Sequence, residues 1–186
     1  MVNPKTYNIP QDANVKAGHR IEALNDGTHI LIRPLDASDR NREFEFIKNL
    51  SPESRHFRFL STMNEASSTL LDQLMDLDYT QRMAYVALIM EGGHLIEIGV
   101  SRYAAMDGNS DCECAVAVAD QWQRRGLGTL LMRALIDAAR SNGFKRMISI
   151  DSSSNTHMHR LADDMGFSCE KDPLDSSQVI YGLELN

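Results

Sequence analysis

The chain has few cysteines and no long apolar run, and each of these absences argues against a class of site or protein. The chain has three cysteines, Cys112, Cys114 and Cys169. Cys112 and Cys114 form a C-x-C pair without a second pair or a nearby histidine, so we expect structural thiols and no metal site. No apolar stretch approaches the roughly 20 residues that span a bilayer, and the polar start of the chain lacks the apolar segment of a secretory signal. These absences predict a cytoplasmic protein without a membrane partner.

Positive charge is also scarce. The chain has 26 acidic residues against 19 Lys and Arg, for a net charge of −7. Because nucleic-acid binding requires clustered Lys and Arg, we expect no nucleic-acid partner. The length suits one domain, so we expect a single domain at 19–186 after a flexible arm at 1–18. A homodimer is compatible with these features.

Apolar periodicity and turn residues predict a mixed α and β protein. The Asn-Asp-Gly turn at 25–27 predicts a hairpin between strands 20–24 and 29–32. Helices are expected at 40–49, from Pro52 onward, at 67–77, from Leu127 to a stop at Gly143, and at 155–165. Strands are expected at 83–90, 95–105, 113–119, 145–151 and 178–185. Antiparallel strands first and a strand–helix–strand crossover later indicate an α+β fold.

Residues 121–129, QWQRRGLGT, place two glycines between a strand and an amphipathic helix. Such a turn presents free backbone N–H groups at the positive end of a helix dipole, and glycines let an anion approach closely. A Walker loop needs a lysine after Gly128, and a dinucleotide fingerprint needs a third glycine where Leu131 stands. The turn is therefore either an anion site of another kind or a plain glycine-rich helix start.

Gln123-Arg124-Arg125-Gly126-Leu127-Gly128 matches the [QR]-x-x-G-x-[GA] signature, and here the chain resembles the GNAT N-acetyltransferase superfamily. Asn155, Leu161 and Gly166-Phe167 keep the spacing of that family's N-x-x-x-x-x-L-x-x-x-x-G-F element. Segments within 26–34, 50–59, 99–103 and 118–123 also resemble the bacterial protein lysine acetyltransferases of the Pat type. The resemblance covers roughly residues 20–186.

This resemblance implies a mostly antiparallel sheet of about six to seven strands, splayed around an acetyl-CoA site and flanked by about four helices. It implies that backbone amides of the turn hold the pyrophosphate and that the strand at 116–118 binds the pantetheine arm. The arginine side chains of the turn either contact phosphate oxygens or form solvated surface. The residues expected to bind acetyl-CoA are Val116, Ala117, Val118, Gln123, Arg124, Arg125, Gly126, Leu127, Gly128, Thr129 and Asn155.

Glu113 stands where the Pat-type enzymes place a glutamate general base. An alkylammonium acceptor has a pKa of about 10, so a base must collect its proton before attack. We expect burial in the strand to raise the pKa of Glu113 toward neutrality; the other interpretation is a hydrogen-bonded glutamate at a strand edge. The resemblance thus implies acetyl transfer from acetyl-CoA to a primary amine, either a protein lysine or a small molecule.

One departure from the family concerns the general acid. Ala162 occupies the position, seven residues after Asn155, where many members carry a tyrosine that protonates the leaving thiolate. The acid is therefore unassigned. This gap supports the alternative function, a catalytically silent acyl-CoA-binding or assembly module with the same fold.

Overall fold

The computed structural model describes residues 18–60, 67–106, 108 and 110–186. The flexible arm expected at 1–18 lies outside these residues, except for Gly18. The single domain expected at 19–186 stays a prediction.

The described residues contain eight strands, five α-helices and two short 3-10 helices. The strands are β1 Arg20–Ala23, β2 His29–Pro34, β3 Arg82–Glu91, β4 His94–Ala105, β5 Asp111–Val118, β6 Arg146–Ser152, β7 Ser168–Lys171 and β8 Gln178–Glu184. The helices are η1 Ala37–Asp39, α1 Arg40–Asn49, α2 Pro52–Phe59, α3 Ser68–Met75, η2 Asp120–Trp122, α4 Leu127–Ser141 and α5 Thr156–Asp164. The predicted α+β class is confirmed: the structure has one strand more than the seven expected, and its five α-helices match the five expected ranges, one more than the family resemblance implies.

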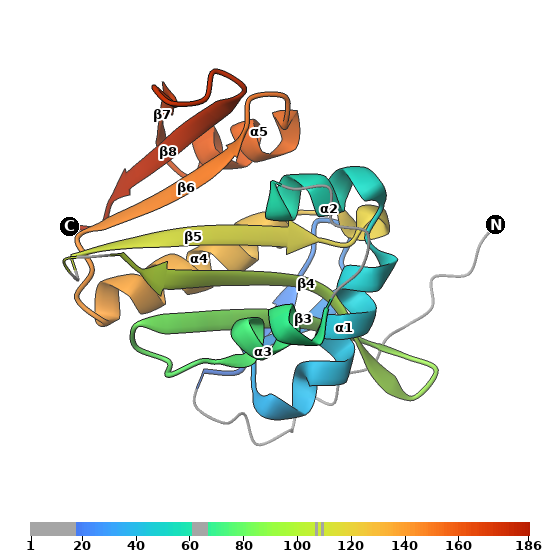
Figure 1. Ribbon diagram of the computed structural model, residues 1–186. Helices are drawn as coiled ribbons and strands as arrows, with labels where there is room; N and C mark the ends of the chain where they lie inside the picture. The colour runs from blue at the N-terminus through green and yellow to red at the C-terminus, as the bar shows by residue number, and fades with distance from the viewer. Residues whose placement is uncertain (1–17, 61–66, 107, 109) are drawn as a thin grey trace.

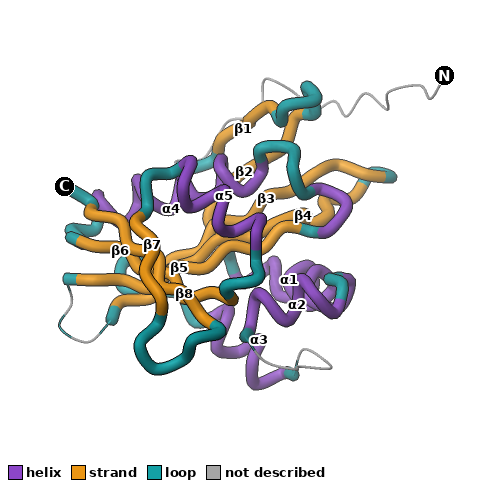
Figure 2. The backbone as a smooth tube through the Cα atoms, turned by 90° about the horizontal axis from the view of Figure 1, so that it is seen from above, coloured by secondary structure: helices purple, strands orange, loops and turns teal. Residues whose placement is uncertain are grey.

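One sheet runs through the molecule in the order β1-β2-β3-β4-β5-β6-β8-β7. Every neighbouring pair is antiparallel except β5 and β6, which are parallel. Figure 2 shows α4 and α5 on one side of the sheet and α1, α2 and α3 on the other. The sheet is thus covered on both sides, and its central strand β3 is accordingly buried along most of its length.

Helix α4 follows directly from its sequence pattern. Its apolar residues recur three and four positions apart, so they form one face that packs into the core against β3, β4 and β5. Leu131 and Leu135 on this face are fully buried. The helix ends where predicted, because Gly143 adopts a left-handed φ of 84° that suits glycine.

Strand β7 was not expected from the sequence. Its four residues, Ser168–Lys171, are all exposed, and they pair with β8 as the sheet's last strand. Because an exposed edge strand has no buried face, its sequence shows no apolar alternation that would reveal it.

The sheet opens between β5 and β6. Their parallel ladder joins only Asp111–Glu113 to Arg146–Ile148, whereas β4 pairs with β5 as far as Val118. The edge of β5 that faces β6 is therefore without a ladder partner over 114–118 in the described structure. Figure 1 shows the two strands side by side at one end and separating toward α2.

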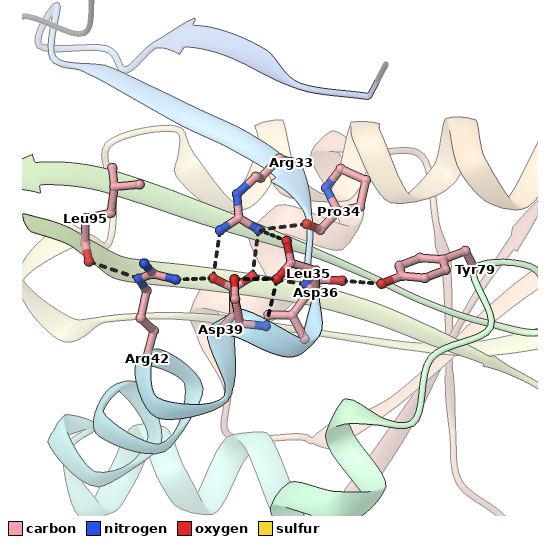
Figure 3. A network of polar contacts seen from close by, with 9 residues as sticks. Arg33, Pro34, Leu35, Asp36, Asp39, Arg42, Tyr79 and Leu95 are labelled. Carbon is pink, nitrogen blue, oxygen red and sulfur yellow. Dashed lines mark hydrogen bonds and ion pairs between the residues drawn. The ribbon is translucent and has the colours of Figure 1, made fainter. Parts of the chain in front are cut away.

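A buried ion pair joins Asp39, the residue directly before α1, to the end of strand β2 (Figure 3). The Asp39 carboxylate accepts hydrogen bonds of 2.6 and 2.7 Å from the Arg33 guanidinium at the end of β2, and one of 2.6 Å from Arg42. Arg42 also donates to the Leu95 carbonyl of β4. These charge-assisted bonds hold the pKa of Asp39 below its ordinary value despite full burial.

Candidate active site

A hollow lies where β5 and β6 separate. This main cavity has a volume of about 480 Å³ and is bounded by α2, the open edge of β5, the turn before α4 and the first residues of α5. It is lined by nine of the residues that the sequence predicted to bind acetyl-CoA: Val116, Ala117, Val118, Gln123, Arg124, Gly126, Gly128, Thr129 and Asn155.

The turn before α4 has the geometry of an anion site. No side chain caps the first turn of α4, so its backbone N–H groups are left for a ligand. Gly126 has a φ of 87° and Arg124 a φ of 60°, and two left-handed residues this close curve the backbone into a concave arrangement of amides. A side chain on Gly128 would place its Cβ 3.2 Å from Leu161. The left-handed φ favours glycine at position 126, and a side chain at position 128 would require Leu161 to shift.

Two expected cofactor residues do not line the main cavity. The Arg125 guanidinium stacks 4.7 Å from the Trp122 ring and pairs with Asp26 at 3.0 Å. The Leu127 side chain lies in the hydrophobic core at 1% exposure, which leaves its backbone alone to face the turn.

Two sets of hydrogen bonds tie the same turn to other elements. Gln123, an expected cofactor residue, donates from Nε2 to Ser54 Oγ of α2 and to the Val118 carbonyl of β5, both at 3.2 Å. Asn25 in the β1–β2 hairpin donates from its backbone N–H to the Arg125 carbonyl at 3.0 Å. The position of Asn25 at the main cavity cannot be predicted from the sequence, because the hairpin and the turn lie far apart in the chain.

Asn155 caps α5 and also holds a second residue that the sequence did not single out. Its Oδ1 accepts from the Met158 N–H at 3.1 Å, while its Nδ2 donates to the Asp151 carboxylate at 3.1 and 3.2 Å. Asp151 lies at the end of β6 and lines the main cavity at 8% exposure. Burial raises the pKa of Asp151 to about 6, and the hydrogen bonds from Asn155 and Ser152 oppose that rise.

Glu113 lies beside the main cavity in a smaller hollow. This side pocket, of about 290 Å³, lies between α2, the end of α3, β3, β4 and β5. The expectation that Glu113 is buried is wrong: side chains alternate along β5, so Cys112 and Cys114 face the core while Glu113 on the opposite face is exposed. Within the described residues its carboxylate makes no hydrogen bond or ion pair, which leaves it accessible to a ligand.

Buried charges form the floor beneath the side pocket. Arg102 of β4 donates to Glu43 of α1 at 2.6 Å and to the Leu74 carbonyl at 2.9 Å. Burial, together with the neighbouring Glu43 carboxylate, raises the pKa of Glu97 well above its ordinary value. The ion pair with Glu43 holds the Arg102 side chain in place, and Arg102 lines the side pocket from strand β4.

Arg58 is shared by the two hollows. Its side chain, from the last turn of α2, lines the main cavity and the side pocket. From the sequence, Arg58 is identified only as part of segment 50–59, which resembles the Pat-type enzymes. Because it contacts both spaces, it marks where molecules bound in the two would meet.

The remaining expectations from the sequence concern the cysteines, Ala162, metal sites and membrane spans. Cys112 and Cys114 are buried free thiols, and burial raises the pKa of Cys112 to about 12. Ala162 is a buried residue of α5 and carries no group that transfers protons. Over 18–60, 67–106, 108 and 110–186, no three His, Cys, Asp or Glu side chains gather as a metal site. Among the same residues no helix has the length and apolar character of a membrane span.

Comparisons with known proteins agree with this arrangement. The family model for acetyltransferases of the GNAT family matches residues 44–167. The chain is 55% identical over 173 residues to acetyltransferase PA5475 of Pseudomonas aeruginosa, covering 93% of both proteins. It is 29% identical over 141 residues to acetyltransferase Pat of Mycolicibacterium smegmatis, covering 75% of this chain and 41% of that longer protein.

The fold is shared with solved structures at low sequence identity. The GNAT domain of S. lividans PAT superposes with a TM-score of 0.80 at 23% identity, covering 89% of this chain and 96% of that domain. The putative acetyltransferase yncA from Salmonella typhimurium, solved with acetyl-CoA, superposes with a TM-score of 0.68 at 20% identity, covering 84% and 94%. With the family model and the relative of 55% identity, these comparisons show that the chain belongs to the GNAT family of acetyltransferases.

Proposed function

We propose that the protein transfers the acetyl group of acetyl-CoA to a primary amine, with Glu113 as general base. One observation carries the proposal: the strand β5 faces both hollows. Its residues Val116–Val118 line the main cavity, and Glu113 on the same strand lines the side pocket. A thioester held in the first space and an amine held in the second would therefore meet along β5.

The main cavity offers hydrogen-bonding groups that suit acetyl-CoA. The uncapped N-terminus of α4 offers backbone N–H groups to a pyrophosphate. The unpaired edge of β5 over 114–118 offers a strand edge to the amide groups of a pantetheine arm. The yncA structure contains acetyl-CoA, and we propose the same donor here, bound along these two elements.

Glu113 supports amine chemistry in the side pocket. Its exposed carboxylate lies on a rigid strand, so a substrate ammonium can approach it and lose a proton to it, directly or through water. The neutral nitrogen then attacks the acetyl carbonyl carbon, the C–S bond breaks, and CoA leaves as the thiol after taking up a proton. Ala162 cannot supply that proton, so we assign its delivery to water in the main cavity.

The experiment is a Glu113→Gln substitution measured over a panel of amines and lysine peptides, with free thiol as the readout. The amide cannot accept the proton, so we expect kcat/KM near pH 7 to fall about 100-fold, the usual share of a general base. Activity should recover partly at high pH, where more of the acceptor amine is already neutral. The affinity for CoA, measured by calorimetry, should stay unchanged.

Glu170→Gln is the matched control, because Glu170 is an exposed strand glutamate on β7, away from both hollows. It should leave the kinetics unchanged. If Glu113→Gln turned over every acceptor at the wild-type rate near pH 7, the assignment of the base would be wrong. Tight CoA binding without transfer to any acceptor would instead favour a silent acyl-CoA-binding module.

A further inference from the structure

The side pocket contains three arginines, and two of them are already neutralised. Arg82 pairs with Asp76 at 2.9 Å and with Asp78 at 3.4 Å. Arg102 pairs with Glu43 at 2.6 Å. Within the described residues, these guanidinium groups therefore have anionic partners of their own.

Arg58 is the third arginine, and it has no such partner. In the described part of the chain it makes no ion pair or hydrogen bond, and its guanidinium lies 4.9 Å from the Phe59 ring. Its side chain is partly buried; this burial, followed by the like charge of Arg102, lowers the pKa of Arg58 to about 10. The group is thus still a cation near pH 7. A partly buried cation without a counter-ion is costly, and such groups concentrate where a ligand supplies the missing charge.

The charges around Arg58 indicate which ligand that is. Arg58 faces both hollows, but the groups that act on it are Arg102, Glu43 and Glu113. Arg102 and Glu113 line the side pocket, and Glu43 pairs with Arg102 directly beneath it. Arg58 thus shares the side pocket with Arg102 and with Glu113, the proposed base that would meet the acceptor.

Glu113 and Arg58 together form a pair of opposite, separated charges. They interact electrostatically across the side pocket but are not joined by an ion pair. A ligand with one positive and one negative group would satisfy both: its ammonium would face Glu113, and its carboxylate would accept two parallel hydrogen bonds from the Arg58 guanidinium. The pocket volume, about 290 Å³, is at the lower end of the range for small-molecule sites, roughly 300–1,000 Å³.

We infer that the acceptor is a small amine with a carboxylate close to the reacting nitrogen, of the free amino acid type, and that Arg58 selects it by binding the carboxylate. This inference rests on the proposed function, since it takes Glu113 to be the group that meets the amine. It narrows the acceptor from any primary amine to a zwitterion.

Binding of reaction products tests the inference without requiring turnover. The ligands are N-acetyl-α-amino acids with apolar, polar, acidic and basic side chains, each compared with its own primary amide. Their affinities for the CoA-saturated protein are measured by isothermal titration calorimetry. We expect at least one acid to bind about tenfold more tightly than its amide, which lacks the charge that Arg58 requires.

Substitutions assign that preference to one residue. Arg58→Gln should bring the ratio between acid and amide close to one, and Arg58→Lys should keep part of it, because lysine retains the charge but not the paired donors. Arg133→Gln removes the same charge from an exposed position on α4 outside the side pocket, and it should leave the ratio unchanged.

The outcomes separate this inference from the proposed function. Equal affinity for acid and amide in the wild type, no binding of either, or a ratio that survives Arg58→Gln would overturn the role of Arg58. A loss of CoA affinity in Arg58→Gln with an unchanged ratio would place the arginine on the donor side instead. A failure of the Glu113→Gln experiment would remove the base while leaving the binding ratio intact.

Discussion

The Ser54 hydroxyl donates a 2.7 Å hydrogen bond to Asp120 Oδ1, and so joins α2 to the turn before α4 across 66 residues of sequence. Ser51 adds bonds from its backbone N–H at 2.9 Å and from its hydroxyl at 2.7 Å to the same carboxylate. These bonds lower the pKa of Asp120, although burial opposes them. The two walls of the main cavity are thus held together by one acidic side chain.

We expect Asp120→Ala to weaken the attachment of α2 to the turn before α4. The affinity for CoA should fall about threefold to tenfold, and the free energy of unfolding should fall by about 1 kcal/mol, because Asp120 is exposed and its bonds compete with water. Calorimetric titration with CoA and urea denaturation measure the two effects. Asp163→Ala, at an exposed position on α5, is the control; equal losses in both variants would contradict the bracing role.

The two glycines Gly126 and Gly143 allow a second matched comparison. Their φ angles are 87° and 84°, so alanine imposes a similar strain of about 1–2 kcal/mol at either position. Only at Gly126 would the new Cβ meet another group, at 2.9 Å from Asn25 Oδ1. We expect Gly126→Ala to weaken CoA binding at least about tenfold and Gly143→Ala to leave it unchanged, as measured by calorimetry. Unchanged affinity in Gly126→Ala would place the anion elsewhere.

Asp151 should make stability depend on pH. Its pKa is about 6 in the folded protein, above the ordinary value of 3.8, so the folded state keeps a proton that the unfolded chain releases first. Stability is therefore lost as pH rises between about 4 and 6, by at most about 3 kcal/mol. Asp151→Asn should remove this loss, so the variant should gain stability relative to wild type over that window. Urea denaturation at pH 4, 5, 6 and 7 measures the difference.

Asp163→Asn serves as the control for the pH series, because Asp163 is exposed on α5. Its difference from wild type should stay constant across the series. A constant difference in Asp151→Asn would show that the folded state does not hold the proton.

The Arg33–Asp39 pair should be far more important for stability than a surface pair of similar geometry. Asp39→Asn removes the buried, hydrogen-bonded counter-ion of Arg33 and leaves only the more exposed Asp36 carboxylate at 3.6 Å, and we expect a loss of about 3 kcal/mol. Asp72 pairs with Arg40 at 2.8 Å but is well exposed, so Asp72→Asn should cost under about 1 kcal/mol. Denaturant unfolding compares the two variants, and similar losses would argue against burial as the source of the difference.

Parts of the fold could be predicted because their residues follow strong local patterns. The apolar face of α4, the stop at Gly143 and the hairpin at 25–27 depend on neighbours in sequence, and all three are confirmed. Gly126 and Gly128 also lie where an amphipathic helix begins after a strand, as the sequence predicts. By contrast, β7 has no buried face to produce a pattern.

The side pocket could not be predicted in the same way. It is assembled from α2, α3 and three strands, so the contact between Arg58 and the space next to Glu113 depends on packing between distant segments. The burial assigned to Glu113 was wrong for a related reason. Alternation along β5 shows that Glu113 and Cys112 face opposite sides of the sheet, but it does not show which side is covered.

The short ladder between β5 and β6 has a consequence for hydrogen exchange. Along 114–118, the backbone N–H groups that point toward β4 are paired, whereas those that point toward β6 have no strand to receive them. The ligand-free protein should therefore show alternating fast and slow amide exchange within a single strand. CoA bound along that edge would slow the fast set, because the ligand takes the place of the strand that is missing there.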